Sequence, residues 1–449
     1  MDHHHDSSIH RFGQGSLVDQ VAIIGLERTK LHTVLRELEG LEGINSIDEV
    51  YLYLQEAHEA LMSLDLFEAV DILIDESAED DEKVSVRISA SELGILGINA
   101  GTYVQGSEGT VEAQFNVRNY AGYGEKLCLS VEQGMSLSNA YALRVSIPRI
   151  GRLPLLADLK IHQSFENKEK WASYVERLRG VTCSVISTDG TMSLSYDCGW
   201  RTLSDPKRMA SPDIVKHLGE SMKSSITLSF ASMHNLNDTC SVNTLTGLEL
   251  GGVGTHGIHQ FLKGNITGNF SYNIADSVEL FLEATAGLIL PSRSTSEEDI
   301  CPSDRFYMGG LGPFGLRGFH QNGLGPMCPR RRNCSPKGGR QRDALGGSCA
   351  LGVVAALRFQ LPYATLTALG MKGQIFANAG TVGNLWGDES IFGGKNPIHT
   401  FQTKIRATVG AGIVWPLKIG QLELNICRVM SQSPSDYSKN GIQFGITPY

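Results

Sequence analysis

From about residue 96 to the end of the chain, apolar and polar residues alternate with a period of two. The clearest stretch is 261–273, where one face carries Leu262, Ile266, Phe270 and Tyr272. The opposite face carries only polar side chains, namely Lys263, Asn265, Thr267, Asn269, Ser271 and Asn273. Because successive side chains of a strand point to opposite faces, this pattern predicts strands with one hydrated and one apolar face.

The alternating segments are long and numerous. Several run for about ten residues, the length that a tilted strand needs to cross a bilayer. A soluble β-sandwich also alternates, but its polar face is not so consistently opposed to a lipid-like one. We therefore predict a transmembrane β-barrel over 96–449, in which an even number of antiparallel strands is expected. The sixteen candidate strands begin near residues 97, 111, 124, 138, 155, 172, 190, 222, 243, 258, 277, 344, 365, 400, 419 and 439.

A small α/β domain is predicted ahead of the barrel, over 17–92. Its elements follow the order β-α-α-β-β and comprise a strand at 18–24, a helix at 30–41, a helix opened by the capping box 46–49, and strands at 69–74 and 84–88. Residues 1–16 lack such a pattern, so we expect them to form a disordered tail.

Charge is distributed unevenly between these two regions. Residues 1–92 hold 21 acidic and 6 basic residues, a balance of −15, whereas the remainder holds 27 and 33, a balance of +6. This asymmetry favours two domains in different surroundings. No long basic patch with interleaved aromatic residues occurs, so nucleic acid is not an expected partner.

The first residues carry neither the basic nor the apolar stretch of a secretion signal. A barrel without that signal is expected in an organelle outer membrane that is reached from the cytosol. No apolar run attains the roughly 18 residues of a membrane-spanning helix.

Cysteine and motif content argue against catalysis. The nine cysteines are odd in number and mostly scattered, so a disulfide framework is not expected. Cys328 and Cys334 flank a basic run that is either an exposed loop or a disulfide or redox site. The sequence contains no H-E-x-x-H, G-x-S-x-G or phosphate-binding lysine motif. We expect no enzyme activity, no metal and no cofactor.

A stretch of about 53 residues, 291–343, separates the eleventh and twelfth candidate strands, and loops of that length are usually functional or disordered. It contains the motifs R-F-x-x-G-G, R-G-F and G-x-G-P and ends in A-L-G-G. This set resembles the sixth external loop of the BamA-type outer-membrane assembly factors, the bacterial surface antigen family. The α/β domain is similar to their polypeptide-transport-associated (POTRA) domain. A single such domain without a secretion signal resembles the mitochondrial branch, which supplies the core of the sorting and assembly machinery.

The resemblance implies roles for particular residues. The loop motif inside the barrel lumen comprises Arg305, Phe306, Gly309, Gly310, Arg317, Gly318 and Phe319. In the family this arginine contacts the inner barrel wall, where bacterial members have an aspartate. Here the matching wall segment offers Asn378, so we expect a hydrogen bond rather than a full salt bridge.

The resemblance also implies an insertase that opens laterally between its first and last barrel strands. Glycines in the first strand weaken its pairing, so we assign the gate to Gly97, Asn99 and Gly101. The last strand matches the family's polar-x-Gly-x-x-apolar-x-apolar signal at Lys439, Gly441, Phe444 and Ile446. The exposed edge would template an incoming strand by β-augmentation.

The partners implied are unfolded β-barrel precursors, metaxin-like accessory subunits and outer-membrane lipids. The implied location is the mitochondrial outer membrane, with the POTRA-like domain in the intermembrane space. Two other functions remain open. The first is a polypeptide or solute channel on the same fold, as in a chloroplast outer-envelope relative, and the second is a soluble adhesive β protein.

Overall fold

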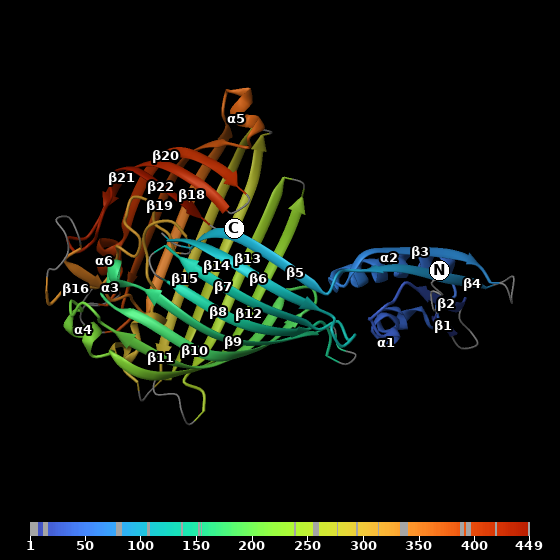
Figure 1. Ribbon diagram of the computed structural model, residues 1–449. Coiled ribbons are helices and arrows are strands. Elements are labelled where there is room, and N and C mark those ends of the chain that lie inside the picture. Colours follow the sequence, from blue (N-terminus) through green and yellow to red (C-terminus); the bar gives the residue numbers. More distant parts are fainter. Residues whose placement is uncertain are drawn as a thin grey trace. The chain divides into compact units, whose positions relative to one another are not determined.

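The protein forms two compact units in the computed structural model, the first comprising residues 1–99, 114–130 and 143–160 and the second the rest of the chain. Figure 1 follows the chain through both. The structure describes residues 8–11, 17–77, 83–105, 108–135, 138–150, 153, 155–237, 239–254, 260–275, 277–292, 295–312, 314–332, 340–386, 390–391, 397–417 and 420–447.

The amino-terminal part is a four-stranded sheet with helices. Its elements are β1 (Ser8–Arg11), β2 (Val18–Ile24), α1 (Leu31–Leu35), η1 (Arg36–Leu41), α2 (Ile47–Ser63), β3 (Phe67–Glu76) and β4 (Val84–Glu92). The strand order is β1-β2-β4-β3, and β2 and β4 run parallel. The apolar face of α2 packs into the core with Val50, Leu54 and Leu61, each at most 3% exposed.

Two details of this part differ from expectation. Ser8–Arg11 pairs antiparallel with β2, so these four residues are not a free tail, while residues 1–7 and 12–16 lie outside the described residues. Ser46 does precede α2, but its side chain makes no capping hydrogen bond, so the predicted capping box is not formed.

The remainder of the chain builds the predicted 16-stranded antiparallel sheet, in the order β22-β21-β20-β19-β18-β15-β14-β13-β12-β11-β10-β9-β8-β7-β6-β5. Neighbours in this order follow one another in sequence, as in an up-and-down barrel. The strands are β5 (Leu96–Gln105), β6 (Glu108–Arg118), β7 (Lys126–Gly134), β8 (Asn139–Ile147), β9 (Leu155–Asn167), β10 (Val175–Ser187), β11 (Met192–Ser204), β12 (Gly219–Asn237), β13 (Cys240–Gly251), β14 (Phe261–Ala275), β15 (Val278–Pro291), β18 (Cys349–Gln360), β19 (Lys372–Gly383), β20 (Arg406–Leu417), β21 (Gly420–Ser431) and β22 (Gly441–Thr447).

The predicted strand starts lie within seven residues of the observed ones. The largest errors fall before β19 and β20, where the short helices α5 (Ala364–Ala368) and α6 (Pro397–Lys404) occupy the positions at which strands were expected to begin. Two more short helices, α3 (Glu169–Ala172) and α4 (Pro212–Val215), lie with α6 at one end of the strands, whereas α5 lies at the other end (Figure 1).

The two faces of the sheet carry the predicted chemistry. On β14, Leu262 and Ile266 are 44% and 47% exposed, as expected for an apolar face turned to lipid. Lys263 lies on the opposite face and donates to the backbone oxygen of Asp304, 2.8 Å away, in the long loop. The polar face therefore encloses this loop. Among the described helices, none combines the length and the apolar character needed to cross a membrane.

Candidate functional site in the lumen loop

The lumen loop, residues 292–348, leaves β15 and returns to its neighbour β18. It contains η2 (Glu297–Asp299), η3 (Pro302–Asp304) and a hairpin of β16 (Met327–Pro329) and β17 (Arg342–Ala344). Its apolar side chains form a buried cluster against the barrel wall, which consists of Ile300, Phe306, Met308, Leu316, Phe319 and Leu324 from the loop and Phe261, Ile289, Ala350 and Val382 from the strands. The loop is thus a packed plug with its own core.

Arg317 joins the tip of the loop to β21. Its Nε and Nη2 atoms donate to the two carboxylate oxygens of Glu423, each at 2.7 Å. Both side chains are buried, and the amide of Asn425 donates to the same carboxylate at 2.7 Å. Burial lowers the pKa of Arg317, but the charge of Glu423 outweighs burial and raises it. The sequence led us to expect a hydrogen bond to Asn378, whereas the guanidinium forms a salt bridge to Glu423.

Asn378 nevertheless lies at this contact. With its amide oriented to satisfy its neighbours, it donates to the Thr408 hydroxyl and accepts from the backbone N–H of Arg317, 2.7 Å from its oxygen. The Thr408 hydroxyl in turn donates to the Arg317 carbonyl, 2.7 Å away. Asn378 therefore bonds to the backbone of Arg317, and Glu423 neutralises the charge of its side chain. The sequence could have pointed to Glu423 as the partner of the arginine, because it is the only acidic residue of β21.

Gly318 allows the loop backbone to approach the wall. Its φ is +86°, and a Cβ atom at this position would lie 2.7 Å from the methyl group of Thr408. Its N–H donates to the side-chain oxygen of Gln443 in β22, at 2.7 Å. Gly309 and Gly310 also have positive φ values, +119° and +82°, where the chain reverses within the predicted R-F-x-x-G-G motif.

The lumen loop also forms hydrogen bonds to the last strand and to the residues just before it. Gln443 donates to the carbonyl of Phe319 at 3.2 Å, and the backbone N–H of Lys439 donates to the carbonyl of Gly318 at 2.8 Å. Phe319 is fully buried and pairs with Ser438. These contacts extend the pairing of β22 from β21 onto the loop.

The other predicted last-strand residues face elsewhere. Gly441 begins β22 with a φ of +100°, and Phe444 is 62% exposed on the apolar face. Ile446 pairs with Leu422 of β21. In this strand, inward contacts to the loop alternate with outward apolar side chains.

A second ionic cluster, which the sequence did not predict, holds the start of the loop. The carboxylate of Asp304 accepts from both terminal nitrogens of Arg201 in β11, at 2.7 and 2.9 Å, and Lys223 lies 3.5 Å away. Arg201 also pairs with Glu176 at 3.0 Å. Burial raises the pKa of Asp304, but the Arg201 guanidinium outweighs it and, with Lys223 and Lys263, holds the pKa well below its usual range.

Arg305 and Phe306 stabilise the same part of the loop. The Arg305 side chain donates to the carbonyls of Ile300 and Glu298 at 3.0 and 2.9 Å. Phe306 and Gly347 exchange two backbone hydrogen bonds of 2.9 Å, which tie the beginning of the loop to its end. Arg305 thus acts within the loop, whereas Arg317 acts across to the wall.

The first barrel strand lies at an edge of the sheet. The hydrogen-bonded order ends at β5 on one side and β22 on the other, and among the described residues no ladder joins the two. Arg118 of β6 lies close to Gly97, within 2.9 Å of where a Cβ atom would stand, and a Cβ atom at Gly101 would have no neighbour within 4 Å. Gly97, Asn99 and Gly101 are thus brought together on this edge strand.

The hairpin of β16 and β17, which leads into the basic run after Cys328, is held in part by an ion pair. Arg330 pairs with the buried carboxylate of Asp343 at 2.7 Å, and Cys328 is a free thiol in the described part of the chain. Cys334 lies outside the described residues, so both alternatives for this run, an exposed loop and a disulfide or redox site, stay predictions.

Comparison with known proteins agrees with this architecture. The Omp85 superfamily domain matches residues 119–447. The chain is 28% identical to the SAM50-like protein of Schizosaccharomyces pombe, over 90% of this chain and 82% of the relative. It is also 28% identical to the sorting and assembly machinery component 50 homolog of Homo sapiens, over 96% and 89%.

Solved structures share the fold. BamA from Haemophilus ducreyi lacking POTRA domains 1–3 superposes with a TM-score of 0.73 at 16% identity, covering 98% of this chain and 88% of that one. CdiB from Acinetobacter baumannii superposes with a TM-score of 0.54 at 14% identity, covering 94% and 72%. Since the matched domain spans most of the chain, the protein is a transmembrane β-barrel that belongs to the Omp85 superfamily.

Proposed function

We propose that the protein is a non-enzymatic insertase that folds β-barrel precursors into the mitochondrial outer membrane. Its relatives among the sorting and assembly machinery component 50 homologs support a role in β-barrel assembly. More specifically, we propose that β5 and β22 separate laterally, so that the free edge of β5 pairs with a strand of the precursor. Metaxin-like subunits and surrounding lipids would be its further partners.

The observation that carries this proposal is the asymmetry of the two sheet edges. β22 is fixed from within, because Gln443 and Lys439 bond to the lumen loop, which Arg317 anchors to β21. β5 carries glycines at positions 97 and 101 and has no such link to the loop among the described residues. An edge strand with unpaired backbone groups is a template for a new strand.

The amino-terminal α/β part would lie in the intermembrane space, as the resemblance implies. Its strongly acidic surface would then meet precursors or partner subunits before they reach the barrel. The lumen loop packs a buried core inside the barrel. A packed interior favours an insertase over an open channel.

The test is a crosslink across the seam in isolated membranes. Ala100 and Phe444 are both exposed on the outer face of the edge strands, so cysteines at these positions leave the lumen loop intact. We expect the Ala100→Cys/Phe444→Cys crosslink to weaken when a β-barrel precursor is imported. A new crosslink from residue 100 to the precursor's last strand should replace it.

A matched control lies in a ladder that is not expected to open. Leu282 and Ala355 are direct partners in β15 and β18 on the same apolar face, so the Leu282→Cys/Ala355→Cys crosslink should not change on import. A seam crosslink that persists while precursors still assemble would contradict lateral opening and favour the channel.

A further inference from the structure

A groove of about 670 Å³ crosses the outer side of the barrel wall over strands β15, β18, β19, β20 and β21. We call it the wall groove. Its lining is almost entirely apolar, and its main outward side chains are Ala355, Leu357, Ile375, Ala377, Val409 and Ile426. The residues that alternate with them point into the barrel, where Phe376 and Cys427 are only 2% and 3% exposed. The wall groove therefore opens toward lipid.

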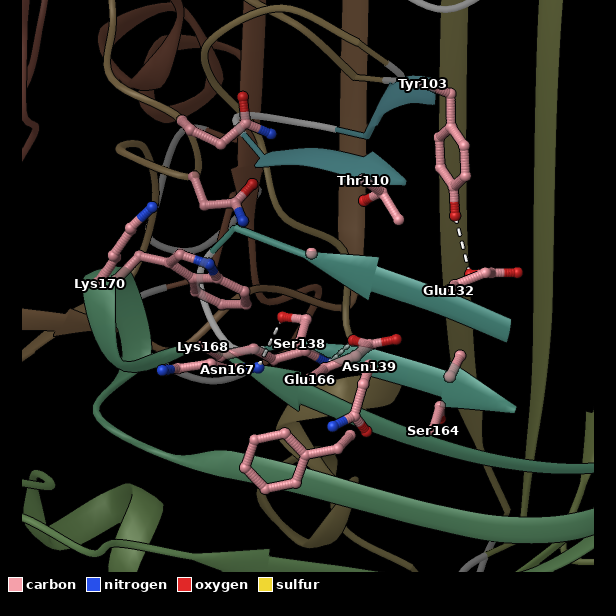
Figure 2. Close-up of a pocket in the computed structure, with 16 residues that line it drawn as sticks. Tyr103, Thr110, Glu132, Ser138, Asn139, Ser164, Glu166, Asn167, Lys168 and Lys170 are labelled. Atoms are coloured by element: carbon pink, nitrogen blue, oxygen red, sulfur yellow. Dashed lines mark hydrogen bonds and ion pairs between the residues drawn. The ribbon is translucent and has the colours of Figure 1, made fainter. Parts of the chain in front are cut away.

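Its chemistry is opposite to that of the cavity on the inner wall. That cavity, of about 310 Å³, is lined by polar and charged side chains of β7, β8 and β9, with the Tyr103 hydroxyl bonded to Glu132 (Figure 2). Lys168 lies 3.1 Å from Glu166 in the same lining, so cations and carboxylates are present together there. The inner cavity suits water, whereas the wall groove suits a hydrocarbon guest.

The wall groove follows a row of small side chains. Ala355 of β18 and Ala377 of β19 are direct partners, and Ala377 also pairs with Val409 of β20. Leu357 and Ile375 form the next outward pair and are 43% and 57% exposed. The alanines thus leave a depression in the outer surface, and the larger side chains beside them form its edge.

Arg428 of β21 lies at one end of this row. It is the direct partner of Val409, so it points outward, and its side chain is exposed. Within the described residues, no carboxylate bonds to Arg428, and no other charged side chain lies on the outer face of these five strands. β21 ends at Ser431, so Arg428 lies within about 10 Å of the strand end, at the level where head groups are expected.

The dimensions of the wall groove restrict what can fill it. Five neighbouring strands at a spacing of about 4.8 Å make it about 19 Å long. Its volume then corresponds to a mean cross-section of roughly 35 Å². A helix with its side chains is about 10–12 Å across and is too thick for this space. An extended acyl chain is thin enough, and the length exceeds the share of one leaflet in the hydrocarbon core, about 15 Å.

We propose that the wall groove binds one anionic phospholipid, with its phosphate on the Arg428 guanidinium and an acyl chain along Val409, Ala377 and Ala355. The guanidinium supplies paired N–H donors that match the phosphate oxygens, and the phosphate supplies the counter-charge that Arg428 lacks. A phospholipid provides this anion and a hydrocarbon chain in one molecule. Binding requires no precursor, so this inference is independent of the proposed function.

The experiment uses the full-length protein in phosphatidylcholine vesicles that contain a smaller amount of phosphatidylglycerol with a photo-crosslinker in its acyl chain. Mass spectrometry locates the adducts, which we expect to concentrate on the wall-groove residues of β18, β19 and β20. Arg428→Gln should lower these adducts roughly tenfold, the effect of losing one charge-assisted hydrogen bond. Arg428→Lys keeps the charge and should retain most of them.

A second variant tests the groove separately from the charge. Ala377→Trp fills the row of small side chains and should remove the adducts although Arg428 is unchanged. Arg179→Gln is the matched control, because Arg179 of β10 pairs with the exposed Trp200 on the outer face and does not line the wall groove. It should leave the adducts as they are. The heat-dependent gel shift confirms that each variant is folded.

Two results would overturn the inference. The first is equal labelling of the wall groove by a phosphatidylcholine probe, or labelling that neither Arg428→Gln nor Ala377→Trp changes, since this would show contact with bulk lipid alone. The second comes from a photo-crosslinking residue at position 377 in isolated membranes. A protein adduct there in place of a lipid adduct would assign the wall groove to a partner subunit.

Discussion

Arg317 and Glu423 form a salt bridge in which both nitrogen–oxygen distances are 2.7 Å and both side chains are buried. A buried charge that loses its partner is left uncompensated, whereas replacement of both partners by apolar residues removes the problem. The position of the lumen loop therefore depends on its salt bridge to β21.

The first prediction is a double-mutant cycle on this pair. Glu423→Leu should destabilise the folded barrel by about 3–5 kcal/mol because Arg317 stays buried and unpaired. Arg317→Met combined with Glu423→Leu should cost much less than the sum of the single changes. Urea unfolding in detergent, followed by the heat-dependent gel shift of the folded barrel, measures each variant. Additive single and double effects would show that the two side chains do not act as a pair.

The second prediction concerns the close approach at Gly318. Gly318→Ala places an alanine at a φ of +86°, which costs about 1–3 kcal/mol, and also brings its Cβ against the Thr408 methyl group. Thr408→Ser removes that methyl group and keeps the hydroxyl that bonds to Arg317, so it should recover part of the loss. Unfolding free energies of the single and double variants provide the measurement.

Gly441 supplies the control for this effect. Its φ is +100°, but a Cβ atom there would have no neighbour within 4 Å. Gly441→Ala therefore reports backbone strain without the clash. Equal losses for the two alanine variants would mean that close approach to Thr408 contributes nothing.

The sequence predicted the barrel well because its signal is local. Alternation fixes which side chains share a face, and a shift of one residue would turn Leu262 and Ile266 into the lumen. The number of strands follows from counting such segments. Errors arose at 364–368 and 397–404, where short helices interrupt the connections and alternation alone does not mark the boundary.

The site was less predictable because its partners are joined by register. Arg201 and Asp304 lie 103 positions apart in the sequence, and Arg317 and Glu423 lie 106 apart. Each pairing depends on the register of the barrel strands and on where the loop enters the lumen. Arg317 and Gly318 could be singled out by their motif, and Glu423 by being the only acid of its strand, whereas the pairing of each with its partner required the folded structure.

The third prediction is that acid loosens the lumen loop through Asp304. Because its pKa is held below that of an unfolded aspartate, about 3.9, the ionised carboxylate stabilises the folded loop above that pH. This stability is lost as the pH falls through the folded-state pKa. Pepsin should therefore cut the loop increasingly fast as the pH drops below about 4.

Asp304→Asn should be cut faster than the unmodified protein at mildly acidic pH and should show a weaker dependence on further acidification. Glu298→Gln is the control, since this side chain is 81% exposed in the same loop. Full acid dependence in Asp304→Asn would assign the transition to other carboxylates.

The last prediction tests whether the loop restrains β22. Gln443 is 6% exposed and satisfies the Gly318 N–H and the Phe319 carbonyl. Gln443→Leu leaves both groups without their partner, at a cost of about 1–3 kcal/mol for each. Hydrogen exchange in 441–447 should accelerate by roughly tenfold or more, since each 1.4 kcal/mol is a factor of ten. Ile442→Ala, at a 66% exposed position of the same strand, should leave exchange near the unmodified rate. If both variants exchange alike, the restraint on β22 comes from β21 alone.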